Sequence, residues 1–196
     1  MQRRSNAYRI SVLGVLMAII IIQNIVPFFG YIPLFGLSIT TIHVTVVIAA
    51  IVLGPKDGAI IGGVWGVIDW IRAFVAPTSP LAPMVFTNPL VSVLPRILIG
   101  VVAGWLYIWF QRRGKDALGM TLAGVAGSLT NTILVLGLIG TLYRTKAAGF
   151  YQIDLSKLMP YLLTIVGTNG VPEAIMAGIL APLIGLPLLR YQRKSR

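Results

Sequence analysis

The chain has 196 residues, of which 57% are hydrophobic and only 11% are charged, and its mean hydropathy is +0.88. This composition excludes a soluble globular domain with a hydrated surface. The formal net charge of +11 comes from clusters at the ends of apolar runs, which is typical of membrane orientation and not of nucleic-acid binding.

Six apolar runs predict six transmembrane helices, because about 20 apolar residues cross the roughly 30 Å of hydrocarbon in a bilayer. We expect these helices near residues 8–26, 39–53, 58–74, 90–110, 117–143 and 158–189. The first run is longer than a signal-peptide core and has no cleavage site after it, so we interpret it as a helix. The predicted fold is an all-α integral membrane protein, a six-transmembrane-helix bundle that forms a single domain over residues 1–196.

The distribution of lysine and arginine predicts the orientation of this bundle. Eleven of these residues lie on the side of the two chain ends and of the loops at Lys56 and 112–115, and five lie on the other side. Cytoplasmic loops carry the excess of positive charge, so we expect a multi-pass protein of the cell membrane with both termini in the cytoplasm. A ligand would be met by the longer outer loops near 28–38, 75–89 and 144–157.

Small residues recur four apart, a spacing that lets helices approach closely in lipid. The examples are Gly14 with Ala18, Gly58 with Gly62 and Gly66, Gly100 with Gly104, and Ala174 with Gly178. We interpret most of them as packing positions inside the protein. The pair on the first helix is a candidate docking surface for a partner.

Ionisable residues inside the runs are few, and each needs a partner or a wet cavity. Asp69 and Arg72 are three residues apart, so they can pair on one helix face or contact a ligand. Arg96 has no acidic neighbour in its own segment. It either pairs with Asp69 or Glu173 from another helix or binds a ligand carboxylate through its guanidinium fork.

Uncharged polar residues mark the same outer half of the chain. Asn88 shares a helix stripe with Arg96, and Asn131 brings an amide into the otherwise aliphatic fifth run. Each of them can contact a ligand or join one helix to another. The predicted substrate-binding residues are Asn88, Arg96, Asn131, Asn169, Glu173, Trp65 and Asp69.

Two local patterns support the last members of this set. Asn169 and Glu173 are one turn apart, and Pro172 between them frees a backbone carbonyl, which is typical of a helix that lines a cavity. Trp65 lies one turn from Asp69 and can wall a pocket.

Catalytic and metal-binding patterns are absent from the sequence. The single histidine, His43, has no Glu or His at ligand spacing, so no metal site is predicted. There is no cysteine, no phosphate-binding glycine loop, and no H-E-x-x-H or G-x-S-x-G motif. We therefore expect no enzyme and no cofactor, and an external source of energy for any transport.

Three stretches resemble the pantothenate-type branch of the substrate-binding S-components of energy-coupling factor (ECF) vitamin importers. They are LSITTIHVTVVIAAIVLGPKDGAIIGGVWGVIDWIRAF, NPLVSVLPRILIGVVAG and GSLTNTILVLGLI, and the overall resemblance covers nearly the whole chain. The resemblance implies a membrane T-component and two cytoplasmic ATPase subunits as partners. It also implies that the protein topples in the bilayer to release its vitamin inside.

The resemblance assigns roles to residues as well. The family commonly carries Ala-x-x-x-Ala on its first helix as a docking groove, and here Gly14 and Ala18 stand at these positions, so the groove is kept with one different residue. The family's pocket lies among helices four to six and is closed by the loop after the first helix. The corresponding residues here are Asn88, Arg96, Asn131, Asn169 and Glu173, with residues 28–35 as the lid.

Pantothenate is the ligand that we favour, because its carboxylate, amide and two hydroxyls suit an arginine and several asparagines. An S-component for a pyrimidine or pyridoxine precursor is the alternative within the family, and there the aromatic residues would matter more than Arg96. Outside the family, the alternatives are an autonomous small transporter and an intramembrane enzyme. The lack of an inverted repeat and of a catalytic constellation argues against these two.

Overall fold

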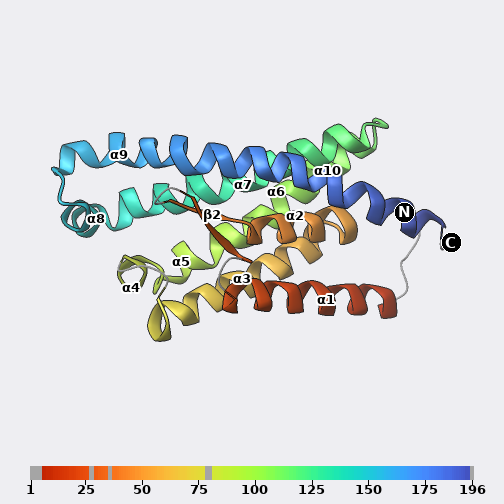
Figure 1. Cartoon of the computed structure of the whole chain (residues 1–196), viewed down its shortest axis with the longest axis horizontal. Helices are drawn as coiled ribbons and strands as arrows, with labels where there is room; N and C mark the ends of the chain where they lie inside the picture. Colours follow the sequence, from red (N-terminus) through yellow and green to blue (C-terminus); the bar gives the residue numbers. More distant parts are fainter. Residues whose placement is uncertain (1–5, 27–28, 35–36, 78–80, 195–196) are drawn as a thin grey trace.

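The computed structural model describes residues 6–26, 29–34, 37–77 and 81–194. In this part of the chain, five helical segments are long and apolar enough to cross a membrane, and a sixth apolar helix, α2, is shorter. They form an elongated bundle in which the start of α1 and the end of α10 lie at the same end (Figure 1). The prediction of an all-α bundle of six helices is confirmed.

The helices follow the six predicted runs closely. The five long segments are α1 (Asn6–Ile25), α3 (Pro55–Val75), α6 (Leu94–Gln111), α7 (Asp116–Leu142), and α9 (Leu158–Ile165), which continues through the π-helix η2 (Val166–Gly170) into α10 (Val171–Lys194). The shorter apolar helix is α2 (Ile42–Leu53). Short elements occupy the predicted outer loops, namely α4 (Ala82–Val85), α8 (Arg144–Tyr151) and η1 (Leu155–Lys157), and the short helix α5 (Pro89–Ser92) stands at the start of the fourth run.

The second and fourth runs begin differently from the prediction. Residues 37–40 do not belong to the second helix but form strand β2 (Leu37–Thr40), which pairs antiparallel with β1 (Tyr31–Leu34) as a hairpin. The fourth run is broken at Val93, which separates α5 from α6. Pro95 lies in the first turn of α6, where a missing backbone N–H costs no helical hydrogen bond.

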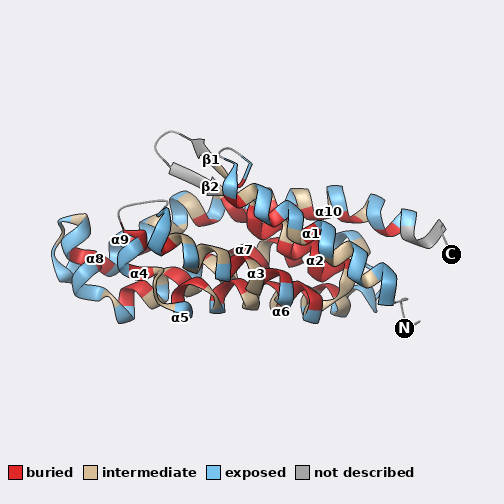
Figure 2. Ribbon diagram, turned by 90° about the horizontal axis from the view of Figure 1, so that it is seen from below, coloured by how far each residue is buried: buried red, intermediate tan, exposed pale blue. Residues whose placement is uncertain are grey.

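Helix α2 is the centre of the bundle and packs against α1, α3, α6, α7 and α10. All of its residues except Thr45 and Leu53 are buried, whereas large apolar side chains on the outer helices are exposed, as lipid contact requires (Figure 2). Its 12 residues extend about 18 Å, so α2 alone cannot cross the hydrocarbon core. It ends at Gly54, whose φ of 105° is readily adopted only by glycine.

Glycines bring the helices close together. A Cβ atom on Gly62 of α3 would collide with the backbone of Arg96, and one on Gly66 would lie 2.6 Å from the Cα atom of Val93. A Cβ atom on Gly104 of α6 would in turn lie 2.6 Å from the Cα atom of Pro55. These contacts confirm that the small residues of α3 and α6 serve packing inside the protein.

Helix α1 is fastened to α3 at both of its ends. Near its start, Arg9 forms an ion pair with Asp57, and near its end Arg72 donates a hydrogen bond of 2.5 Å from Nη1 to the carbonyl oxygen of Asn24. Both contacts join residues 48 positions apart, so the two helices run parallel in one constant register. Between these clamps, the buried side chains of α1 form a single stripe of Leu16, Ile20 and Asn24.

Candidate functional site

An apolar layer in the middle of the bundle defines the floor of the site. A Cβ atom on Gly127 of α7 would lie 2.8 Å from Val47 of α2 and 3.3 Å from Ile99 of α6. Three helices therefore meet at this level, and all three positions are apolar. They fix the relative register of α2, α6 and α7.

One turn nearer the hairpin, the same three helices change from apolar to polar residues. Counting three or four residues from each floor position leads to His43 on α2, Arg96 on α6 and Asn131 on α7. The π-helix joins this level, because a Cβ atom on Gly170 would lie 2.9 Å from Thr132. The helix register thus gathers residues that are far apart in the sequence into one polar layer.

Arg96 is buried in this layer and is held on several sides. Its Nη2 donates to Oδ2 of Asp69 at 3.2 Å, and its Nη1 donates to the carbonyl oxygen of Val91 at 2.9 Å. The guanidinium carbon lies 5.1 Å from the ring centroid of Trp65 and 5.2 Å from that of Phe86, which adds cation–π attraction. Its Nε has no hydrogen-bond partner in the described structure. Arg96 is therefore fixed in place, and its Nε–H is among the donors still available.

Asp69 pairs across helices and not within its own helix. Besides Arg96, it accepts a long hydrogen bond of 3.5 Å from the hydroxyl of Tyr31 in β1. The predicted pair with Arg72 is not formed, since Arg72 instead binds the backbone of Asn24. Burial, followed by the nearby Asp69 carboxylate, raises the pKa of Tyr31, so this hydroxyl remains a donor at neutral pH.

Glu173 of α10 anchors the other strand of the hairpin. Its Oε1 accepts a hydrogen bond of 2.7 Å from the backbone N–H of Thr40, which lies opposite Tyr31 in the hairpin register. Each strand is thus fastened at its base, one to α3 and one to α10. The first strand of the hairpin falls within the segment predicted as the lid, residues 28–35. The two end residues of that segment, Phe28 and Phe35, lie outside the described residues.

Several buried polar atoms of the described structure have no hydrogen-bond partner. Apart from Oδ1 of Asn24 on α1, they are Nδ1 and Nε2 of His43, Nε1 of Trp65, Nε of Arg96, Oγ of Ser128, Oδ1 of Asn131 and Oδ1 of Asn169. Buried polar groups in folded proteins are normally paired, because an unpaired one loses its hydrogen bonds to water without replacement. The polar layer is therefore the candidate site, because it concentrates hydrogen-bonding groups that a polar molecule could satisfy.

Asn169 reaches this layer through an irregular helix. It lies in the π-helix that immediately precedes α10, in which Pro172 is the second residue. π-Bulges are rare and are often found at functional sites. The loosened helix predicted around Pro172 is present.

Asn88 has a local role in the structure. Its Oδ1 accepts from the backbone N–H of Leu90 at 3.0 Å, so the side chain caps the short helix α5. Its carbonyl oxygen accepts from the hydroxyl of Ser92 at 3.1 Å. Of the predicted site residues, Asn88 is the one whose side chain is engaged in local backbone structure.

His43, Ser128 and Tyr31 are further candidate residues that the sequence analysis does not select for the site. His43 had been considered only as a metal ligand, and the described residues contain no cluster of metal-binding side chains. The signal that could have revealed it is its position in a short, uniformly apolar helix, where an imidazole is the one strongly polar side chain.

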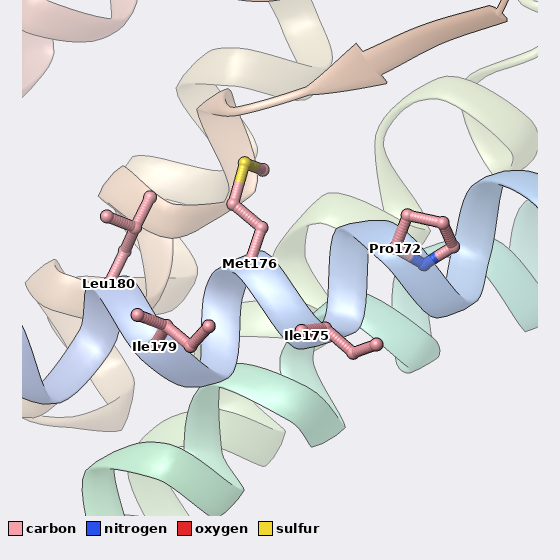
Figure 3. A pocket seen from close by; sticks show the side chains of 5 residues that line it. All are labelled: Pro172, Ile175, Met176, Ile179 and Leu180. Atoms are coloured by element: carbon pink, nitrogen blue, oxygen red, sulfur yellow. The ribbon is translucent and has the colours of Figure 1, made fainter. Parts of the chain in front are cut away.

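A separate shallow groove on α10 does not belong to the polar layer. It is lined by Pro172, Ile175, Met176, Ile179 and Leu180, with Met176 and Leu180 pointing toward α2 (Figure 3). Ile175 and Ile179 are exposed on the outer surface of the bundle. An apolar groove of this kind suits lipid chains and offers nothing to a polar ligand.

The fold is that of a membrane-embedded helical protein, and the polar layer in one half of the bundle is its candidate site. The chain matches the family model described as "ECF transporter, substrate-specific component" over residues 9–185, and it belongs to this family. It is thus a multi-pass membrane protein of a transporter family. This match confirms the resemblance drawn from the sequence.

Two curated relatives are similar to the chain over most of its length. It is 38% identical over 189 residues to the pantothenate transporter PanT of Leuconostoc mesenteroides, with 91% of each chain covered. It is 31% identical over 207 residues to the pantothenic acid transporter PanT of Lactococcus lactis, with 98% of this chain and 99% of the relative covered.

Proposed function

We propose that this protein is the substrate-binding subunit of an ECF-type importer, which captures pantothenate from outside and delivers it inward with an ATPase module. The observation that carries this proposal is the buried Arg96, which keeps an unpartnered Nε inside a layer of unpartnered amide, hydroxyl and imidazole groups. The names of the two relatives support pantothenate as the ligand.

The ligand's carboxylate is the natural partner of Arg96. Asp69 and the carbonyl of Val91 each accept from one terminal nitrogen, whereas Nε has no partner, so we infer that an incoming carboxylate binds at the Nε edge. The Asp69 contact at 3.2 Å is longer than a strong charge-assisted bond, so Nη2 can be shared with the ligand. The amide and hydroxyls of pantothenate would then meet Asn131, Asn169 and Ser128.

Docking to the T-component is assigned to the outer face of α1. Gly14 and Ala18 are both exposed, and a Cβ atom on Gly14 would meet no atom within 4 Å. The glycines of α3 and α6 are instead covered by neighbouring helices. The open pair on α1 is therefore a surface on which a helix of another protein can pack closely.

The orientation that we propose places both termini in the cytoplasm. The two chain ends lie at the same end of the bundle as the start of α3 and the loop between α6 and α7 (Figure 1). This is the end that carries the larger group of lysines and arginines. The hairpin and the polar layer then belong to the outer half.

Equilibrium binding to the purified protein tests this function. We expect labelled pantothenate to bind with nanomolar affinity, which corresponds to about 12 kcal/mol, and unlabelled pantothenate to compete while pyridoxine and thiamine do not. Reconstitution with and without the ATPase module would show ATP-dependent uptake only in the complete complex. Binding of a pyridoxine-type or pyrimidine-type compound in place of pantothenate would overturn the ligand assignment.

A further inference from the structure

A fully buried imidazole lies in the first turn of α2. His43 has an exposed fraction of 0%, and neither Nδ1 nor Nε2 has a hydrogen-bond partner in the described structure. A neutral imidazole carries one donor and one acceptor, so both of its hydrogen-bonding functions are unmet. The main chain of Glu173 lies beside the ring, but without the geometry of a hydrogen bond.

The position of His43 relates it to the polar layer. It lies one turn before Val47, and Asn131 lies one turn after Gly127, the residue whose missing side chain leaves room for Val47. Since α2 and α7 run in opposite directions, His43 and Asn131 are at the same level. This level directly follows β2, whose last residue, Thr40, is bound by Glu173.

Other roles for this histidine find no support in its surroundings. The described residues provide no set of side chains for a metal ion at this place. Lipid does not reach the ring, because it is fully buried. No intramolecular hydrogen bond explains it as an element of helix packing, and an aliphatic residue would pack in α2 at lower cost.

We propose that His43 contacts the ligand and forms a hydrogen bond with one of its hydroxyl groups, which makes His43 a specificity-determining residue. This inference rests on the proposed function. A hydroxyl is both donor and acceptor, so it complements an imidazole that offers one of each. The carboxylate end of the ligand is bound by Arg96 on α6, and the hydroxyl-bearing end then meets His43 on α2.

The energetic consequence is discrimination between related ligands. A site that hydrogen-bonds a substrate hydroxyl rejects an analogue without it strongly, because the buried protein group is then left unpaired. His43 therefore contributes less to the affinity for a ligand of the right size than to the discrimination against an analogue that lacks this hydroxyl.

The experiment measures affinities for pantothenate and for two analogues that each lack one of its two hydroxyls. The wild-type protein is expected to bind one of the analogues at least about 100-fold more weakly than pantothenate. His43→Leu should lower the affinity for pantothenate at least about tenfold and leave the affinity for that analogue unchanged, so the discrimination collapses. His43→Gln, which keeps a donor and an acceptor, should restore part of it.

Thr45→Val is the matched control on the same helix, since Thr45 bonds Gln23 of α1 at 2.9 Å and does not face the polar layer. It should bind all three compounds like the wild type. Equal losses for pantothenate and both analogues in His43→Leu, or no loss, would overturn the role of His43 while leaving pantothenate binding intact. A wild-type protein that binds no pantothenate would overturn the proposed function, and this inference with it.

Discussion

Arg9 and Asp57 form a two-pronged ion pair, in which Nε lies 2.7 Å from Oδ2 and Nη2 lies 2.5 Å from Oδ1. The side chain of Asp57 is 6% exposed, whereas that of Arg9 is 40% exposed. The two partners thus differ in hydration: without the ion pair, the guanidinium of Arg9 can still be solvated by water, whereas the buried carboxylate of Asp57 cannot. It joins the first turns of α1 and α3.

We expect Arg9→Gln to lower the thermal unfolding midpoint by several degrees and Asp57→Asn to lower it less. The first change leaves a buried carboxylate without its partner, whereas the second leaves a guanidinium that turns toward water. Thermal unfolding of the purified variants in detergent measures both. The double variant should resemble Asp57→Asn, and equal effects of the two single changes would contradict this prediction.

Gly14→Trp should abolish uptake by the complete importer while ligand binding to the isolated protein stays normal. The side chain would fill the open surface of α1 and keep a partner helix away. Gly62→Ala is the opposite case, because its methyl group would collide with the backbone of Arg96 inside the protein. Gly62→Ala should therefore lower the folding yield. Normal uptake by Gly14→Trp would refute the assignment of the docking surface.

Arg96→Ala should weaken pantothenate binding by at least the roughly 1.5 to 3 kcal/mol of a charge-assisted hydrogen bond, which is about ten- to a hundredfold. It should also destabilise the fold, since Asp69 would be left buried without its cation. Asn131→Ala should cost less affinity, because it removes a neutral contact.

The double variant Arg96→Ala/Asp69→Ala separates these two effects. Removing both charges should restore part of the thermal stability without restoring affinity. Unchanged affinity in Arg96→Ala would remove this residue from the site, and recovery of affinity in the double variant would show that only the buried charge mattered. Both quantities are measured on the same purified samples.

Glu173→Ala should speed up dissociation of the ligand several-fold, because the hairpin loses its anchor at Thr40. Glu173→Gln keeps an oxygen acceptor and should have the smaller effect. Stopped-flow displacement of a bound ligand measures the rate. If the two variants dissociate at the wild-type rate, the hairpin is not a gate for the site.

Cysteines introduced at Lys56 and Thr145 should react with a membrane-impermeant reagent from opposite sides of the membrane. The chain has no cysteine of its own, so the background is clean, and both positions are exposed. We expect Thr145→Cys to react in intact cells and Lys56→Cys only after the membrane is opened. Reaction of both in intact cells would contradict the orientation.

The helices could be predicted well because hydrophobic length is a local property of the chain. The hairpin could not be predicted from the sequence, because its last residues continue into the apolar run of α2 and its position depends on contacts with distant helices. One of these anchors, Glu173, is 133 positions from its partner Thr40. The break at Val93 is not predicted, and the π-helix before Pro172 is predicted only as a general effect of proline.

The site shows the same division between local and distant information. The sequence left open whether Arg96 pairs with another helix or binds a ligand, because Asp69 is 27 residues away and nothing local fixes their distance. The structure shows the pair and also the unpaired Nε–H of Arg96. His43 was dismissed because a lone histidine is a poor metal site, although a neutral imidazole has other uses.

The shortness of α2 has an electrical consequence. Its 12 residues extend about 18 Å, so the packed barrier beneath the polar layer is thinner than the hydrocarbon core. In the proposed orientation, a ligand bound in the polar layer would lie on the outer side of this barrier. Carrying one negative charge toward a negative interior costs about 2.3 kcal/mol per 100 mV. In the proposed function, capture of the anionic ligand would therefore depend little on voltage, and the electrical work would fall on the inward step, for which the ATPase module would supply energy.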